Sequence, residues 1–179
     1  MRIAAVTDPS MARRALLGAA VAATCLAGFS VGAPPASAAP ALARCTPSQL
    51  AVTVKVAGAA AGTVGYDLTV TDTSRSACLV QGHAGVSLVD AHGSQIGAPA
   101  VWMAGPAPWV TLSRGSSATA LVLVSDYAVW PPQRCQARTA SAVRVYVPDA
   151  YQPVYVPATV TVCSAVPDGL RTAAFRPGL

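Results

Sequence analysis

Few side chains in this 179-residue chain could carry out acid–base or nucleophilic chemistry. The histidines are His83 and His92, all seven acidic residues are aspartates, and Ser116 and Ser117 form a serine pair. A hydrolase needs a nucleophile, a base and a group that orients the base. No Gly-x-Ser-x-Gly motif is present, and the serine pair lies in a predicted turn with no histidine near it in sequence. We therefore expect no catalytic residues and no enzyme activity.

The rival hypothesis is a hydrolase whose Ser, His and Asp side chains meet only in the folded chain. A pocket that unites His83 or His92 with an aspartate and a serine would favour it. Paired carboxylates for sugar hydrolysis would have to come from aspartates such as Asp67, Asp72 and Asp90. The strand pattern places these three at outward positions or in turns, where solvated charges are expected.

A copper site is the next alternative, because histidine and methionine side chains can bind copper in exported β-sandwich proteins. His83, His92 and Met103 could supply the ligands. The two histidines are nine residues apart and His92 falls in a predicted turn, which fits no compact ligand motif. We expect surface histidines, no metal site and no cofactor.

Aromatic side chains give the best signal for binding. Candidate binding residues are Trp102, Trp109, Trp130, Tyr151 and Tyr155, all of them in or beside segments rich in proline and glycine. Aromatic side chains in such loops either plug the open ends of a β-sandwich or face outward for a ligand. The outward arrangement predicts a glycan or protein partner at the cell envelope.

The N-terminus has the three parts of an export signal. Arg13-Arg14 precedes an uncharged run over residues 15–32, and Ala36-Ser37-Ala38 fits a small-residue cleavage site. We expect residues 1–38 to be removed; a retained membrane anchor is the alternative. The arginine pair is compatible with twin-arginine export and with ordinary secretion.

Cleavage after residue 38 leaves a chain long enough for one domain with its own core. Residues 39–44 form an Ala/Pro-rich stretch that we expect to be a flexible tether, and residues 45–179 a single domain. The formal net charge of +5 falls to about +3, and the basic residues are scattered. We therefore expect a secreted or extracytoplasmic monomer that has no nucleic-acid partner and no membrane span after signal cleavage.

Four cysteines remain after Cys25 is removed with the signal: Cys45, Cys78, Cys135 and Cys163. The thiols of an exported protein oxidise, and the lack of a Cys-x-x-Cys motif argues against a zinc or redox site. Of the three possible pairings we favour Cys45–Cys78 with Cys135–Cys163, because each pair then brackets successive strands. Lipidation of Cys25 stays open, although Ala-Ala-Thr before it is a poor match to a lipid-attachment signal.

Alternation of apolar and polar residues, which is typical of half-buried strands, recurs along the mature chain. Prolines and glycines separate these segments, and no amphipathic helical pattern is present. The apolar segments include Val52–Val56, Val64–Val70, Val86–Asp90, Ala118–Val124, Val143–Val147 and Val160–Val162. Ala118–Val124 is apolar on both faces, which indicates a central strand covered on both sides or a strand whose small alanines lie under a loop. Seven or eight short strands predict an all-β fold, an antiparallel β-sandwich with two disulfides.

Four further motifs are Cys45-Thr-Pro-Ser-Gln-Leu50, Thr71-Asp-Thr-Ser-Arg-Ser-Ala-Cys78, Gly82-His-Ala-Gly-Val-Ser-Leu-Val-Asp90 and Gln95-Ile-Gly-Ala-Pro99. Together they resemble the actinobacterial domain-of-unknown-function family 4232. The resemblance extends from about Cys45 to Cys163. It implies an exported protein or lipoprotein with an immunoglobulin-like sandwich, and it implies no activity. His83-Ala84 stands where the family would have an aromatic residue followed by proline.

The sequence therefore predicts an exported, non-catalytic binding or structural module of the cell envelope or medium. Its ligand stays unspecified beyond a cell-envelope glycan or protein.

Overall fold

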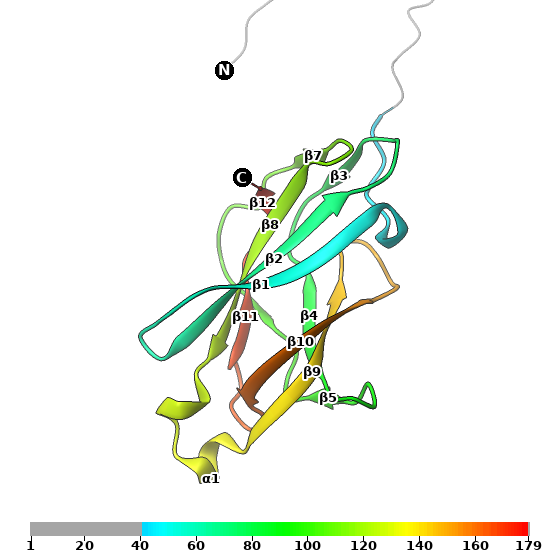
Figure 1. Cartoon of the computed structure of the whole chain (residues 1–179). Coiled ribbons are helices and arrows are strands. Elements are labelled where there is room, and N and C mark those ends of the chain that lie inside the picture. Colours follow the sequence, from blue (N-terminus) through cyan, green and yellow to red (C-terminus); the bar gives the residue numbers. More distant parts are fainter. Residues whose placement is uncertain (1–40, 179) are drawn as a thin grey trace, which may run out of the picture. The chain divides into compact units, whose positions relative to one another are not determined.

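The structure, a computed structural model, describes residues 41–178, which belong to one compact unit (Figure 1). The predicted signal at residues 1–38 lies outside the described residues. Within residues 41–178, no helix has the length and hydropathy needed to cross a membrane.

The described chain contains both long and very short strands. The strands are β1 (Leu50–Ala60), β2 (Thr63–Asp72), β3 (Cys78–Val80), β4 (Gly85–Val89), β5 (Gln95–Ile96), β6 (Val101–Trp102), β7 (Val110–Leu112), β8 (Ser117–Ser125), β9 (Ala137–Tyr146), β10 (Val154–Cys163), β11 (Leu170–Thr172) and β12 (Arg176–Pro177). The helical segments are η1 (Pro47–Gln49), η2 (Tyr127–Val129) and the single-turn α1 (Pro132–Cys135).

These strands form three sheets. The largest has the order β1-β2-β8-β11-β6, with β12 also paired to β8. The second has the order β10-β9-β4-β5, and β3 and β7 form a separate two-stranded sheet. The antiparallel pair of β1 and β2 ends in a two-residue turn, Ala61-Gly62, in which both residues have positive φ. Such turns match the twist of a hairpin, and the tip of this hairpin extends beyond the other strands in Figure 1.

The all-β class and the two disulfides are confirmed, but two details of the prediction are wrong. The described residues contain twelve strands and not seven or eight, because six of the strands are only two or three residues long, which is too short for a clear apolar–polar alternation. The arrangement is also not wholly antiparallel, since β6 pairs in parallel with β11. The partner of β6 lies near the end of the chain, so local sequence carries no signal for this pair.

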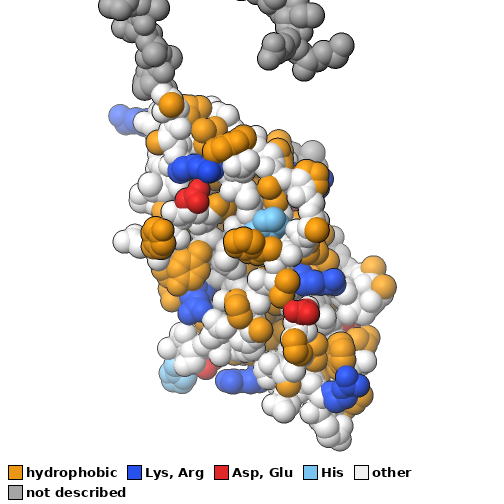
Figure 2. Space-filling view, turned by 180° about the vertical axis from the view of Figure 1, so that it is seen from behind, with side chains coloured by type: hydrophobic (Ala, Val, Ile, Leu, Met, Phe, Trp, Pro, Cys, Tyr) orange, Lys and Arg blue, Asp and Glu red, His pale blue; other side chains and the backbone are white. Residues whose placement is uncertain are grey.

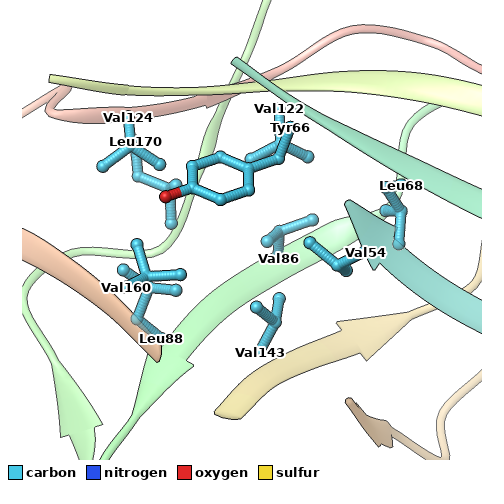
Figure 3. A pocket seen from close by; sticks show the side chains of 10 residues that line it. All are labelled: Val54, Tyr66, Leu68, Val86, Leu88, Val122, Val124, Val143, Val160 and Leu170. Carbon is cyan, nitrogen blue, oxygen red and sulfur yellow. The ribbon is translucent and has the colours of Figure 1, made fainter. Parts of the chain in front are cut away.

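Apolar side chains of the two larger sheets face each other and form the core. Leu68 and Val122 of the first sheet and Val86 and Val143 of the second are buried and point into the same space (Figure 3). A gap of about 10 Å³ remains among them. This is at the lower limit for one water molecule, and the apolar lining favours an empty gap. Tyr66 also lines the gap, and burial raises the pKa of its phenol.

β8 lies in the middle of the largest sheet, as its apolar sequence predicted. It pairs with β2 on one side and with β11 and β12 on the other. Its inward residues Val122 and Val124 are buried, whereas Leu121 on the outward face is 38% exposed. The strand is therefore central within the sheet, but its outward face is open to solvent.

The favoured disulfide pairing is confirmed. Cys45 bonds Cys78 at the start of β3, and Cys135 at the end of α1 bonds Cys163 at the end of β10. Val160 and Val162 belong to the core while Cys163 lies on the opposite face of β10. The second disulfide therefore attaches the end of a strand to a loop and does not cross between the sheets.

The burial of Asp72 contradicts one prediction made from the strand pattern. This residue lies at the end of β2 with no exposed surface, not in a solvated position. Its Oδ1 accepts a hydrogen bond from the backbone N–H of Ser74 at 2.7 Å, while Oδ2 has no hydrogen-bond partner among the described residues. Burying a carboxylate oxygen without a hydrogen-bond donor costs folding free energy, because the oxygen loses its hydrogen bonds to water and gains none from the protein.

We expect each disulfide to contribute about 3 kcal/mol to the free energy of unfolding, because the sequence separations are 33 and 28 residues. Replacing Cys135 and Cys163 together with alanine should lower stability by that amount in urea denaturation. The double replacement of Cys45 and Cys78 should have a similar effect. Mass spectrometry of the native protein should detect no free thiol among these four residues; free thiols would contradict the structure.

We expect Asp72→Asn to be at least as stable as the wild type at neutral pH. The amide keeps the Oδ1 acceptor for Ser74 and removes the buried charge. Asp72→Ala should instead lose about 1 to 2 kcal/mol, because the Ser74 N–H also loses its partner. Thermal unfolding of both variants tests this, and an Asn variant as unstable as the Ala variant would show that the carboxylate charge is stabilising.

Candidate binding site

Two of the predicted aromatic residues lie at the two ends of one loop and face solvent. Trp102, at the end of β6, is 63% exposed, and Trp109, directly before β7, is 54% exposed. Neither residue plugs an end of the fold. The outward arrangement, the second of the two alternatives from the sequence, is therefore the one present.

The loop between these tryptophans is held by hydrogen bonds from other segments. His83 Nε2 lies 2.9 Å from the carbonyl oxygen of Met103, and Gln81 Nε2 donates to the carbonyl oxygen of Ala107 at 3.1 Å. The N–H of Met103 donates to the carbonyl oxygen of Thr172 at 2.9 Å. Because a carbonyl oxygen only accepts, His83 Nε2 carries the proton, and Nδ1 of the neutral ring is an acceptor.

The ring of His83 also supports the ring of Trp102. Their centroids are 5.3 Å apart and their planes differ by 12°, so the two rings are stacked. One histidine thus holds both the backbone after Trp102 and the side chain of Trp102. The exposed indole is therefore restrained before any ligand arrives.

A hollow of about 360 Å³ lies beside this stacked pair. We call it the aromatic hollow; its lining residues are Gln81, Gly82, His83, Gly85, Trp102, Tyr146, Val147, Pro148, Asp149 and Ala150. Gly85 lets Tyr146 lie close to β4, since a Cβ at position 85 would be only 3.3 Å from the Tyr146 Cβ. The hollow therefore combines aromatic walls with the polar atoms of Gln81, His83 and Asp149.

Arg44 connects the hollow to Trp109. Its Nε lies 3.2 Å from Oδ2 of Asp149, and its guanidinium carbon lies 4.0 Å from the centroid of the Trp109 ring. The backbone of Leu79 donates to Ala43 and accepts from Cys45. Ala43 and Arg44 are thus fixed against β3. These two residues therefore do not belong to the flexible tether that the sequence predicted over residues 39–44.

Tyr155 lies on the same side of the second sheet as Tyr146, and Tyr151 lies on the loop that joins β9 to β10. Tyr155 of β10 is 51% exposed and stands opposite Arg144 of β9, whose guanidinium lies 6.0 Å from the ring of Tyr146. Arg144 also donates to the side chain of Gln95. Tyr151, on the loop after β9, is 96% exposed. An aromatic surface therefore continues from the hollow along β9 and β10.

Trp130 does not belong to this surface. It follows η2 and directly precedes α1, and its ring lies 5.7 Å from the guanidinium of Arg134. Trp109 directly precedes β7, and Figure 1 shows α1 and β7 at opposite ends of the domain. The five aromatic residues selected from sequence are therefore divided between two regions.

Figure 2, a space-filling view of one face of the domain, shows hydrophobic side chains next to a histidine. Basic and acidic side chains lie between the hydrophobic ones. Hydrophobic groups are dispersed over this face and do not form one continuous patch. Such a surface suits contacts with a ligand that presents both apolar and polar atoms.

The side chains that hydrolysis or metal binding would require already form structural contacts. The lining of the aromatic hollow includes His83 and Asp149 but no serine, and His83 Nε2 and Asp149 Oδ2 already face Met103 and Arg44. Among residues 41–178, no three His, Cys, Asp or Glu side chains lie close enough to hold a metal ion. The hollow therefore offers contacts for binding more readily than a nucleophile for catalysis.

His92 lies in a turn organised by Asp90. Oδ1 of Asp90 accepts from the N–H groups of His92 and Ser94 at 2.9 and 3.0 Å. The hydrogen bond from Ser94 contributes most to lowering the pKa of Asp90, with smaller contributions from the His92 N–H and the charges of His92 and Arg138. This Asp–His–Ser cluster shapes an exposed turn.

Sequence reasoning missed several residues of the hollow. Gln81, Tyr146 and Asp149 carried no motif of their own, and neither did Arg44, which contacts Asp149; Gly85 lay in a family motif but was given no role in binding. Gln81 and His83 are two residues apart at the entrance to a strand, which could have suggested a shared role. The contacts of Arg44 and Asp149 join segments remote in sequence, so no local pattern could have indicated them.

One family model matches residues 45–176; its description is Domain of unknown function (DUF4232). No curated protein and no solved structure matches the chain.

We expect His83→Ala to loosen Trp102, because both the ring stack and the hydrogen bond to Met103 are lost. In a background with Trp109→Phe and Trp130→Phe, Trp102 is the sole tryptophan, and its fluorescence anisotropy should fall. His83→Phe should retain part of the anisotropy, because the stack remains without the hydrogen bond. His92→Ala is the matched control. Equal anisotropy in the His83 and His92 variants would contradict this role.

Proposed function

The chain belongs to the DUF4232 family of domains of unknown function, and we propose that it is an exported, non-catalytic module that binds a cell-envelope polysaccharide on the aromatic hollow. The observation that carries this proposal is the restrained exposure of Trp102. Its indole is 63% exposed, yet it is stacked on His83 beside a hollow of about 360 Å³.

Restraint favours a binding role, because a fixed side chain loses little conformational entropy when a ligand arrives. An exposed indole also leaves a large apolar face in water, and covering that face is favourable. Three hydrogen bonds from Gln81, His83 and Met103 hold the loop after Trp102 in place, so the indole stays exposed although this exposure is unfavourable.

A sugar polymer suits the hollow better than a flat protein surface does. Sugar rings have apolar faces that can lie on aromatic rings, and hydroxyl groups that need polar partners at their edges. Tyr146 and Trp102 supply the rings, while Asp149 and Nδ1 of His83 supply acceptors. A stable protein interface usually covers about 800 Å² on each partner, and the apolar groups on this surface are interrupted by charged side chains.

Export is supported by the two disulfides, which favour an oxidising compartment. The signal pattern at residues 1–38 adds sequence support. We also propose that the face-to-face sheets derive from an immunoglobulin-like sandwich, as the family resemblance implies, with β6 as an added parallel strand. The working form is a monomer.

Binding to purified cell-wall polysaccharide tests the proposal directly. The double variant Trp102→Ala/Trp109→Ala should bind at least about tenfold more weakly than the wild type, since two aromatic contacts are lost. Trp130→Ala, at the other end of the domain, is the matched control and should bind within about twofold of the wild type.

The polysaccharide should be treated with protease before the assay. Binding that disappears after this treatment would identify a protein partner and contradict the proposal. Equal binding by the Trp102/Trp109 and Trp130 variants would remove the hollow as the site, and lack of binding to every polysaccharide fraction would remove the function.

A further inference from the structure

A second hollow lies on the other side of the backbone at Trp102 and Met103. Its volume is about 480 Å³, and it is open to solvent on the outward face of the largest sheet. We call it the Asp67–Arg176 groove; its lining residues are Asp67, Met103, Ala104, Gly105, Pro106, Thr119, Leu121, Ala173, Ala174, Arg176 and Pro177. No residue of the aromatic hollow belongs to this lining.

Opposite charges stand on two sides of this groove. Asp67 of β2 is opposite Leu121 of β8, and Arg176 of β12 is opposite Thr119 of β8. The two charged residues are thus separated by β8, which places their strands about 10 Å apart. Both residues are exposed.

Neither charge is neutralised within the described part of the chain. The ion pairs present there are Arg44 with Asp149 and Arg138 with Asp90. Asp67 stands across from Lys55 in the β1–β2 register but forms no ion pair with it. An aspartate and an arginine therefore remain available on opposite sides of one groove.

The framework that presents Arg176 is firmly held. Phe175, the preceding residue, has no exposed surface, and its N–H donates to the carbonyl oxygen of Gly82 at 2.9 Å. The N–H of Gly178 donates to the carbonyl oxygen of Ser117 at 2.8 Å. Arg176 thus projects from a segment fixed on both sides, so the position of its charge is defined by the fold.

The groove between the charges is lined by small and apolar groups. Leu121 is 38% exposed on its floor, and Ala173 and Ala174 line it together with two prolines. The hydroxyl of Thr119 already exchanges a hydrogen bond with Thr69 at 3.1 Å. This lining suits small aliphatic side chains.

We propose that the Asp67–Arg176 groove binds short peptides of small residues that have free termini. The ammonium group of the peptide lies at Asp67, its carboxylate at Arg176, and its methyl groups on Leu121 and the alanines. An extended peptide of two or three residues spans about 7 to 11 Å, which is comparable with the spacing of about 10 Å between the strands that carry Asp67 and Arg176. A simple anion would face the repulsion of Asp67, and a simple cation that of Arg176.

This inference does not depend on the polysaccharide proposal, because the two sites have separate linings and different chemistry. Loss of peptide binding in a groove variant leaves the aromatic hollow intact. Loss of polysaccharide binding in a Trp102 variant leaves both groove charges in place. The two proposals can therefore fail separately.

The test uses the full oxidised chain and the peptides dialanine and trialanine, with binding measured by titration calorimetry or NMR shifts. Acetylating the N-terminus or amidating the C-terminus should each weaken binding about fivefold, which is the upper range for one exposed ion pair. Asp67→Asn should abolish the effect of acetylation, and Arg176→Gln should abolish the effect of amidation. Arg171→Gln, an exposed arginine on the neighbouring β11, is the matched control.

Circular dichroism and thermal unfolding establish that the variants fold, which is expected because both side chains are exposed. The proposal is overturned if neither free peptide binds, or if blocked and free peptides bind equally. It is also overturned if Trp102→Ala weakens peptide binding as much as the groove variants do. Binding that responds only to amidation and only to Arg176→Gln would reduce the groove to an anion site and contradict the peptide assignment.

Discussion

Hydrogen bonds from residues 81–85 connect the parts of the fold that surround both hollows. Gln81 and His83 donate to the loop between the two exposed tryptophans, and the carbonyl oxygen of Gly82 accepts from Phe175 in the C-terminal segment. Gly82 has a φ of 99°, which a residue with a side chain would adopt only with strain. Because the proline-rich loop forms few backbone hydrogen bonds of its own, these contacts determine where Trp102 and Met103 lie. One short segment thereby positions a wall of each hollow.

The two hollows differ because the few charged residues of the chain are unevenly distributed between them. Beside the aromatic hollow, Asp149 is paired with Arg44, so aromatic rings and neutral polar atoms dominate the surface. Beside the groove, Asp67 and Arg176 form no ion pair with any other residue of the 41–178 range, so opposite charges dominate.

Regular alternation made the long strands predictable, whereas the short ones depend on their partners. The pair of β1 and β2 and the central place of β8 followed from apolar periodicity. β6 and β12 are two residues long and exist because β11 and β8 supply hydrogen-bond partners. For the candidate site, the aromatic residues could be selected from the sequence as a class, but neither their exposure nor the separation of Trp130 from Trp102 and Trp109 could be predicted. The burial of Asp72 could not be predicted either, because a polar residue at the end of a strand is assigned from sequence to the turn that follows.

By itself, the sequence determined the all-β class, and it favoured the disulfide pairing that the structure has. Periodicity, apolar runs and cysteine order are local or one-dimensional properties, so they can be read without coordinates. Only the tertiary structure decided that Trp102 stacks on His83, that Arg44 joins Asp149 to Trp109, and that Asp67 and Arg176 share a groove. Each of these contacts joins segments that are distant in sequence. Their geometry depends on sheet order and register, which follow from packing of the whole domain and not from any single stretch.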